Sequence, residues 1–237
     1  ACHGMCAAAP AIPVPDVDRP DYLCVMAANP AASNGSLMSL GDVRGRLRGI
    51  RERGGKLVLL DPRRTETADW ASEHVFIRPG GDAAFLLALL HVLFAEDLVD
   101  RAALAAVANG GAELAALAAR FPPERVAAAT GVPAETVRRL AREFAAARRA
   151  VCYGRVGSCQ NEFGSVASWL QEVVNVVTGN FDREGGAMFT TPAVDLGRVT
   201  RTAGLDRWGR WKSRVRGLPE LGGPLPAAVM AAGMEAE

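Results

Sequence analysis

The stretch Lys56-Leu-Val-Leu-Leu-Asp61-Pro-Arg-Arg-Thr65 indicates the fold class of this chain, because a continuous apolar run ends abruptly in a charged turn. Lys56 to Leu60 has the length and composition of a strand buried on both faces, and a loop follows it. Asp21 to Ala27 and Ala150 to Gly154 have the same form. Continuous apolar strands are typical of parallel sheets that are covered on both sides.

Helical segments alternate with these strands. A helix from about Asp42 to Arg53 joins the first two strands, which makes a βαβ unit whose crossover we expect to be right-handed. A second helix runs to about Glu96, and we expect Asp82 to cap it. It is apolar on nearly every face, so neighbours should cover all its sides. Residues 101–148 are mostly helical, and the last helix spans about Phe163 to Thr178.

These patterns predict an α/β protein with a mostly parallel, Rossmann-like sheet flanked by helices and a loop-rich C-terminal segment. We expect an extended N-terminal segment in residues 1–20 and an α/β cofactor-binding region in residues 21–189. Residues 190–237 lose periodicity, and we interpret them as a loop-rich tail that forms an incomplete domain.

Composition excludes several classes of function. Among 237 residues, 27 Lys and Arg balance 26 Asp and Glu, so net charge gives no argument for a nucleic-acid partner. The longest apolar run, Ala83 to Ala95, is too short to span a membrane. The five cysteines include no Cys-x-x-Cys pair, which argues against an iron–sulfur cluster held by this chain. We expect a cytoplasmic location, with an incomplete N-terminus.

Polar loops follow the strands at Met26 to Ser33, Asp61 to Thr65, Arg78 to Asp82 and Arg155 to Gln160. The carboxyl ends of parallel strands form the ligand crevice of an open α/β sheet, where helix N-termini suit phosphate groups. The sequence therefore predicts a nucleotide-containing cofactor.

Particular side chains suit that cofactor. Asp61 can accept hydrogen bonds from a ribose or a base edge, and Arg63 and Arg64 can pair with a pyrophosphate. No Gly-x-Gly-x-x-Gly motif follows the first strand, which argues against a nicotinamide site. An NAD(P)-dependent dehydrogenase, with Asp61 as the ribose-binding acid, stays as the weaker alternative.

The run from Lys56 through Ala68 to Ile77-Arg-Pro-Gly-Gly-Asp82 resembles the molybdopterin oxidoreductases of the dimethyl sulfoxide reductase family, which includes formate dehydrogenases and nitrate reductases. The resemblance implies a molybdopterin guanine dinucleotide cofactor with Mo or W and two-electron redox chemistry. It also implies the cofactor-binding residues, which are Ala28, Asn29, Pro30, Ser33, Asp61, Arg63, Thr65, Gly81, Asp82 and Gln160, with Val156 as a further contact.

The sequence departs from this family at both ends. The N-terminal cysteine cluster and the C-terminal domain of the family are absent, and Thr190-Thr191-Pro192 replaces an arginine found in many formate dehydrogenases. Cys2 is a candidate metal ligand and His3 a candidate proton-handling group. In the alternative, Pro10 to Asp16 aligns with family members that have no metal ligand in this segment, and Cys2 then binds no metal.

Two interpretations of the chain's role follow from these departures. The chain is part of a molybdopterin-dependent oxidoreductase that remaining domains or subunits complete, or it is a truncated, non-catalytic fragment or interaction module without metal. The sequence leaves open whether this chain is an enzyme by itself.

Overall fold

The computed structural model describes residues 13–38, 40–189, 191, 193–204, 209–220, 225–226 and 229–236. The chain divides into two units, residues 1–190 and residues 191–237. The first unit carries the α/β fold. Within the described residues, no helix is both long enough and apolar enough to cross a bilayer.

A four-stranded sheet forms the centre of the first unit. Its strands are β2 (Tyr22–Met26), β3 (Lys56–Leu60), β4 (Glu73–Val75) and β5 (Ala150–Gly154), in the order β4-β3-β2-β5. Every neighbouring pair is parallel. Three of these strands match the segments predicted from their apolar runs, so the α/β class with a parallel sheet is confirmed.

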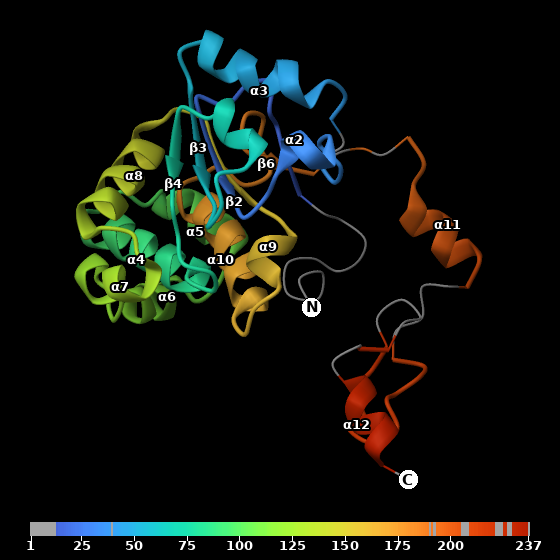
Figure 1. Cartoon of the computed structure of the whole chain (residues 1–237). Helices are drawn as coiled ribbons and strands as arrows, with labels where there is room; N and C mark the ends of the chain where they lie inside the picture. Colours follow the sequence, from blue (N-terminus) through green and yellow to red (C-terminus); the bar gives the residue numbers. More distant parts are fainter. Residues whose placement is uncertain are drawn as a thin grey trace. The chain divides into compact units, whose positions relative to one another are not determined.

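Helices cover both faces of this sheet, which explains why its strands are continuously apolar (Figure 1). Alternate side chains of β2 point to opposite faces, as strand geometry requires. Tyr22, Cys24 and Met26 join the core with the large helical layer. Leu23 and Val25 pack on the other face with α3 (Val43–Glu52).

The large helical layer centres on α4 (Asp82–Ala95), which packs against four other helices: α6 (Gly111–Ala118), α7 (Pro123–Thr130), α8 (Ala134–Ala146) and α10 (Gly164–Val177). This environment confirms that α4 is covered on nearly all sides. The expectation that Asp82 caps α4 was wrong, because Gly81 is the N-cap residue and Asp82 is the first helical residue.

Short elements complete the first unit. They are β1 (Val14–Pro15), α2 (Pro30–Ser33), the 3₁₀ helix η1 (Glu66–Asp69), α5 (Arg101–Val107), α9 (Val156–Cys159) and β6 (Ala187–Met188). β1 and β6 pair antiparallel as a separate two-stranded sheet. α9 occupies a segment that we expected to be a loop.

Side chains of residues later in the sequence form hydrogen bonds with the free backbone groups of edge strand β5. The Asn175 amide exchanges two hydrogen bonds with the backbone of Cys152, donating to its oxygen at 2.9 Å and accepting from its nitrogen at 2.8 Å. Asn180 Oδ1 accepts a third bond from the Ala150 nitrogen at 3.1 Å. These amides satisfy backbone groups that an edge strand otherwise leaves open.

The second unit contains two short helices, α11 (Leu196–Thr202) and α12 (Met230–Glu235). The Ser213 nitrogen donates to the Leu218 oxygen at 2.9 Å and forms a turn between α11 and α12. Glu220 is buried and accepts a hydrogen bond from the Arg210 nitrogen at 3.1 Å.

Candidate functional site

The strand order places a topological switch point at the carboxyl end of β2. From β2 the chain moves to β3 and β4 on one side, and then returns to β5 on the other side of β2. Loops that leave neighbouring strands in opposite directions open a crevice, which is where open α/β sheets bind ligands. The loops after β2, β3 and β5 therefore define the candidate site.

The loop after β2 is tied to the segment after β3 through Asn29. The Thr67 hydroxyl donates to Asn29 Oδ1 at 2.7 Å and accepts from the Ala31 nitrogen at 3.1 Å. Asn29 Nδ2 donates to Glu66 Oε2 at 2.8 Å. Hydrogen bonds from its own backbone amide and from Asn29 lower the pKa of Glu66. These bonds fix the start of α2 against η1.

On the other side, the β2 loop lies directly against the segment after β5. The Gly157 nitrogen donates to the Ala27 oxygen at 3.2 Å, and a Cβ at Gly157 would lie 2.7 Å from that oxygen. Only glycine permits this approach. Ala27 has φ +46°, in the left-handed region that costs a non-glycine residue free energy. The Arg155 guanidinium also donates a hydrogen bond to the Ser36 backbone oxygen, and this bond joins the same two segments at a second point.

A second group of side chains gathers around Asp61. Its Oδ1 accepts from the Arg63 nitrogen at 2.8 Å, and its backbone oxygen lies 3.1 Å from His74 Nε2. Asp82 is buried, and its burial together with the charge of Asp61 raises its pKa above the ordinary carboxyl value. Two carboxyl groups are thus held close together at the ends of β3 and α4.

Three buried polar atoms of this region lack a hydrogen-bond partner within the described part of the chain. They are Thr65 Oγ1, His74 Nδ1 and Asp82 Oδ1. A buried polar atom without a partner costs on the order of 1–3 kcal/mol. Such a group of acceptors and donors is the arrangement expected where a polar ligand completes the hydrogen bonds.

The remaining residues expected at the site fall into two sets. Ala28, Pro30 and Gly81 are buried and shape the backbone of the loops. Ser33, Arg63 and Gln160 are exposed, and within the described chain Ser33 and Gln160 make no side-chain hydrogen bond to the others. The Arg63 guanidinium lies 3.8 Å from Glu66.

Cys2 and His3, the candidate metal ligand and proton-handling group, lie outside the residues that the structure describes. Thr67 and His74 are not among the residues that the sequence predicted for the site. The position of His74 one strand away from Asp61 was the available signal, whereas nothing local indicated that Thr67 would bond to Asn29.

Comparisons with known proteins give the class to which this fold and site belong. No protein-family model matches the chain. The chain is 36% identical over 137 residues to the molybdopterin-containing subunit of thiosulfate reductase from Salmonella typhimurium, covering 57% of this chain and 18% of that protein. It is 30% identical over 168 residues to formate dehydrogenase H of Escherichia coli, covering 71% and 23%.

Two further relatives extend the comparison. A dimethyl sulfoxide/trimethylamine N-oxide reductase of Cereibacter sphaeroides is 31% identical over 180 residues, covering 72% of this chain and 22% of that protein. The structure of acetylene hydratase from Pelobacter acetylenicus superposes with a TM-score of 0.61 at 26% identity, covering 71% of this chain and 23% of the other.

The chain belongs to the molybdopterin oxidoreductase family. It spans about a fifth of the length of the curated relatives that it matches.

Proposed function

We propose that this chain binds the guanosine end of a molybdopterin guanine dinucleotide at the carboxyl edge of its parallel sheet. The observation that carries this proposal is that Thr65 after β3, His74 on β4 and Asp82 at the start of α4 each have a buried polar atom without a partner in the described part of the chain. Membership of the molybdopterin oxidoreductase family supports the choice of ligand.

The chemistry of these side chains fits guanine. The exocyclic amino group of guanine is a hydrogen-bond donor, and a carboxylate only accepts. Asp61 and Asp82 supply acceptors, and the Thr65 hydroxyl can both donate and accept. Adenine presents a different order of donors and acceptors on this edge, so such a site should prefer guanine.

The other proposed contacts lie on the neighbouring loops. Ala28 and Asn29 in the loop after β2, with Pro30 and Ser33 of α2, would line the ligand on one side. Arg63 is exposed on the neighbouring loop and is free to turn toward a phosphate, because its 3.8 Å contact with Glu66 is weak. Gly81 and Gln160 complete the proposed set.

The names of the relatives support the proposal that this chain holds a cofactor and does not select the substrate. The relatives are named for thiosulfate, formate, dimethyl sulfoxide and acetylene, yet they share this segment. A segment common to proteins with such different substrates serves what they have in common. When bound, the Mo or W centre of the cofactor supplies the two-electron chemistry, and the residues of this chain position it.

We propose further that other domains or subunits of the same oxidoreductase complete the site. The chain matches only about a fifth of each relative. A catalytic activity of the whole oxidoreductase therefore belongs to that assembly.

Titration of the full chain with GDP and with ADP tests the proposed guanosine site. We expect GDP to bind about tenfold more tightly, since one discriminating hydrogen bond is worth about 1.4 kcal/mol. Asp82→Ala should abolish most of this preference. Asp69→Ala is the matched control, because Asp69 is exposed and pairs with Arg64. Equal affinities for GDP and ADP would contradict the proposal, as would identical behaviour of the two variants.

A further inference from the structure

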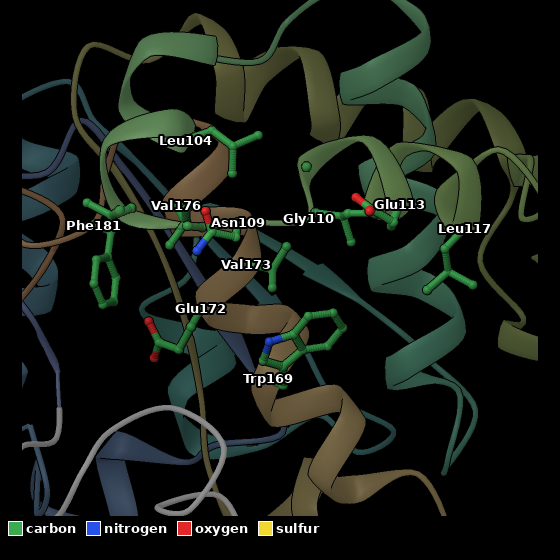
Figure 2. Close-up of a pocket in the computed structure, with 14 residues that line it drawn as sticks. Leu104, Asn109, Gly110, Glu113, Leu117, Trp169, Glu172, Val173, Val176 and Phe181 are labelled. Atoms are coloured by element: carbon green, nitrogen blue, oxygen red, sulfur yellow. The ribbon is translucent and has the colours of Figure 1, made fainter.

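A cavity separate from the carboxyl edge of the sheet lies in the helical layer. It has a volume of about 470 Å³, and residues of α10, α5 and α6 line it together with Phe181 (Figure 2). This volume lies within the range of small-molecule sites, about 300–1,000 Å³. The cavity is partly open to solvent, so a small molecule can reach it.

The lining of this cavity is mainly apolar and carries charge of one sign. Seven of the fourteen lining residues are leucine, valine or alanine, and the aromatic rings are those of Trp169 and Phe181. Among the described residues, the charged lining residues are Glu113 and Glu172, and none is Lys, Arg or His. Within the described part of the chain, neither glutamate forms an ion pair.

Glu172 is the lining carboxyl group next to the aromatic rings. Figure 2 shows its carboxyl group between the rings of Trp169 and Phe181. Burial raises the pKa of Glu172 to about 7, while a 3.3 Å hydrogen bond from Asn175 Nδ2 acts in the opposite direction. The titratable groups that face it are the Cys152 thiol on β5 and Glu113 across the cavity on α6.

A carboxyl group in an apolar cavity without a cation beside it favours a positively charged partner. A cation that enters the cavity would compensate the half-buried negative charge, and the face of Trp169 attracts cations as well. We propose that this cavity binds a small amphiphilic cation, with its ammonium group against Glu172 and its apolar body against the leucine and valine side chains. The proposal is independent of the guanosine site at the carboxyl edge of the sheet.

Calorimetric titration of the full chain with phenethylammonium at pH 8 tests this proposal, with 2-phenylethanol as the neutral ligand of similar size. We expect the cation to bind at least about tenfold more tightly than the alcohol. Glu172→Gln should remove this preference while it keeps the oxygen that accepts from Asn175. Glu162→Gln is the matched control, because Glu162 is exposed and lies outside the cavity.

A second measurement needs no variant. At pH 5.5 Glu172 is protonated while phenethylammonium keeps its charge, so the wild-type chain should lose most of its preference for the cation. Equal binding of the two ligands at pH 8, no binding of either, or a preference that survives in Glu172→Gln would overturn the proposal. A concentration-dependent dimer in sedimentation, abolished by Leu117→Asp, would overturn it in favour of a second copy as the occupant.

Discussion

Asn29 and Thr67 lie 38 positions apart, and the Thr67 hydroxyl donates a 2.7 Å hydrogen bond to Asn29 Oδ1. Thr67 is fully buried, and its oxygen also accepts from the Ala31 nitrogen. One hydroxyl group therefore joins the loop after β2 to the segment after β3. These two loops border the switch point of the sheet, so this bond sets the shape of the proposed cofactor site before any ligand arrives.

Thr67 and Thr65 provide a matched test of this arrangement. Thr67→Val removes a buried hydroxyl whose partners remain, so we expect the free energy of unfolding to fall by about 1–3 kcal/mol. Thr65→Val removes a buried hydroxyl without a partner in the described chain, so it should leave stability unchanged or raise it. Urea denaturation of both variants measures these changes.

The same two variants should respond differently to GDP. We expect Thr65→Val to weaken GDP binding although it folds normally, because the ligand would supply the missing partner. If Thr65→Val destabilises the chain as much as Thr67→Val and binds GDP like the wild type, Thr65 has a structural role and no part in the site.

Asn175 should be more important for stability than any exposed asparagine. Asn175→Ala leaves the Cys152 nitrogen and oxygen buried without partners, so we expect a loss of about 3 kcal/mol in the free energy of unfolding. Asn109→Ala is the control, because Asn109 is exposed. Thermal melting followed by circular dichroism compares the two. Equal melting temperatures would show that water replaces the amide at β5.

Glu172 should make stability fall as pH rises. Its pKa is about 7 in the folded chain against an ordinary 4.5, so the folded state binds the proton more tightly between these values. The contribution of protonated Glu172 to the free energy of unfolding is therefore fully present below about pH 4.5. It is lost as pH rises to about 7, by about 3 kcal/mol in total. Glu172→Gln should lack this decline and be more stable than the wild type at pH 8. If the stability of the wild type and of Glu172→Gln changed with pH in the same way, Glu172 would not be the cause of the decline.

Asp16 should act in the opposite direction. Burial opposes its ionisation, but hydrogen bonds from Arg19, Gly185 and Asp18 outweigh burial and lower its pKa. Its contribution to stability is thus present above the ordinary carboxyl pKa of about 4 and is lost as pH falls through the lower folded value. Asp16→Asn should reduce stability by about 2 kcal/mol at pH 7 and remove this acid loss. Denaturation curves at pH 7 and pH 3 measure both effects.

Sequence reasoning was most reliable where the physical signal is local. β3 and β5 were predicted because a strand buried on both faces must be apolar at every position, as Leu57 to Leu60 and Ala150 to Cys152 are. The β1–β6 pair was not predicted, because two-residue strands show no periodicity. It depends on contacts between segments more than 170 residues apart, at Val14 and Met188.

At the candidate site, too, features set by the local sequence were predicted and features set by distant contacts were not. Asp61, Thr65 and Asp82 were expected from their place after strands and from the family resemblance. The sequence could not indicate that Asp82 begins α4 without capping it, because Gly-Gly-Asp allows the helix to start at either residue. It also could not reveal that His74 Nδ1 lacks a partner among the described residues, since a partner's presence depends on the packing of distant segments.

We propose above all that this chain binds a molybdopterin guanine dinucleotide. The most direct test is to purify it from cells that make the cofactor, and to measure Mo and W by plasma mass spectrometry and guanine nucleotide after acid release. We expect metal and guanine nucleotide to be recovered together with the chain, and Asp82→Ala to lose both. A folded chain that contains neither metal nor guanine nucleotide would contradict it.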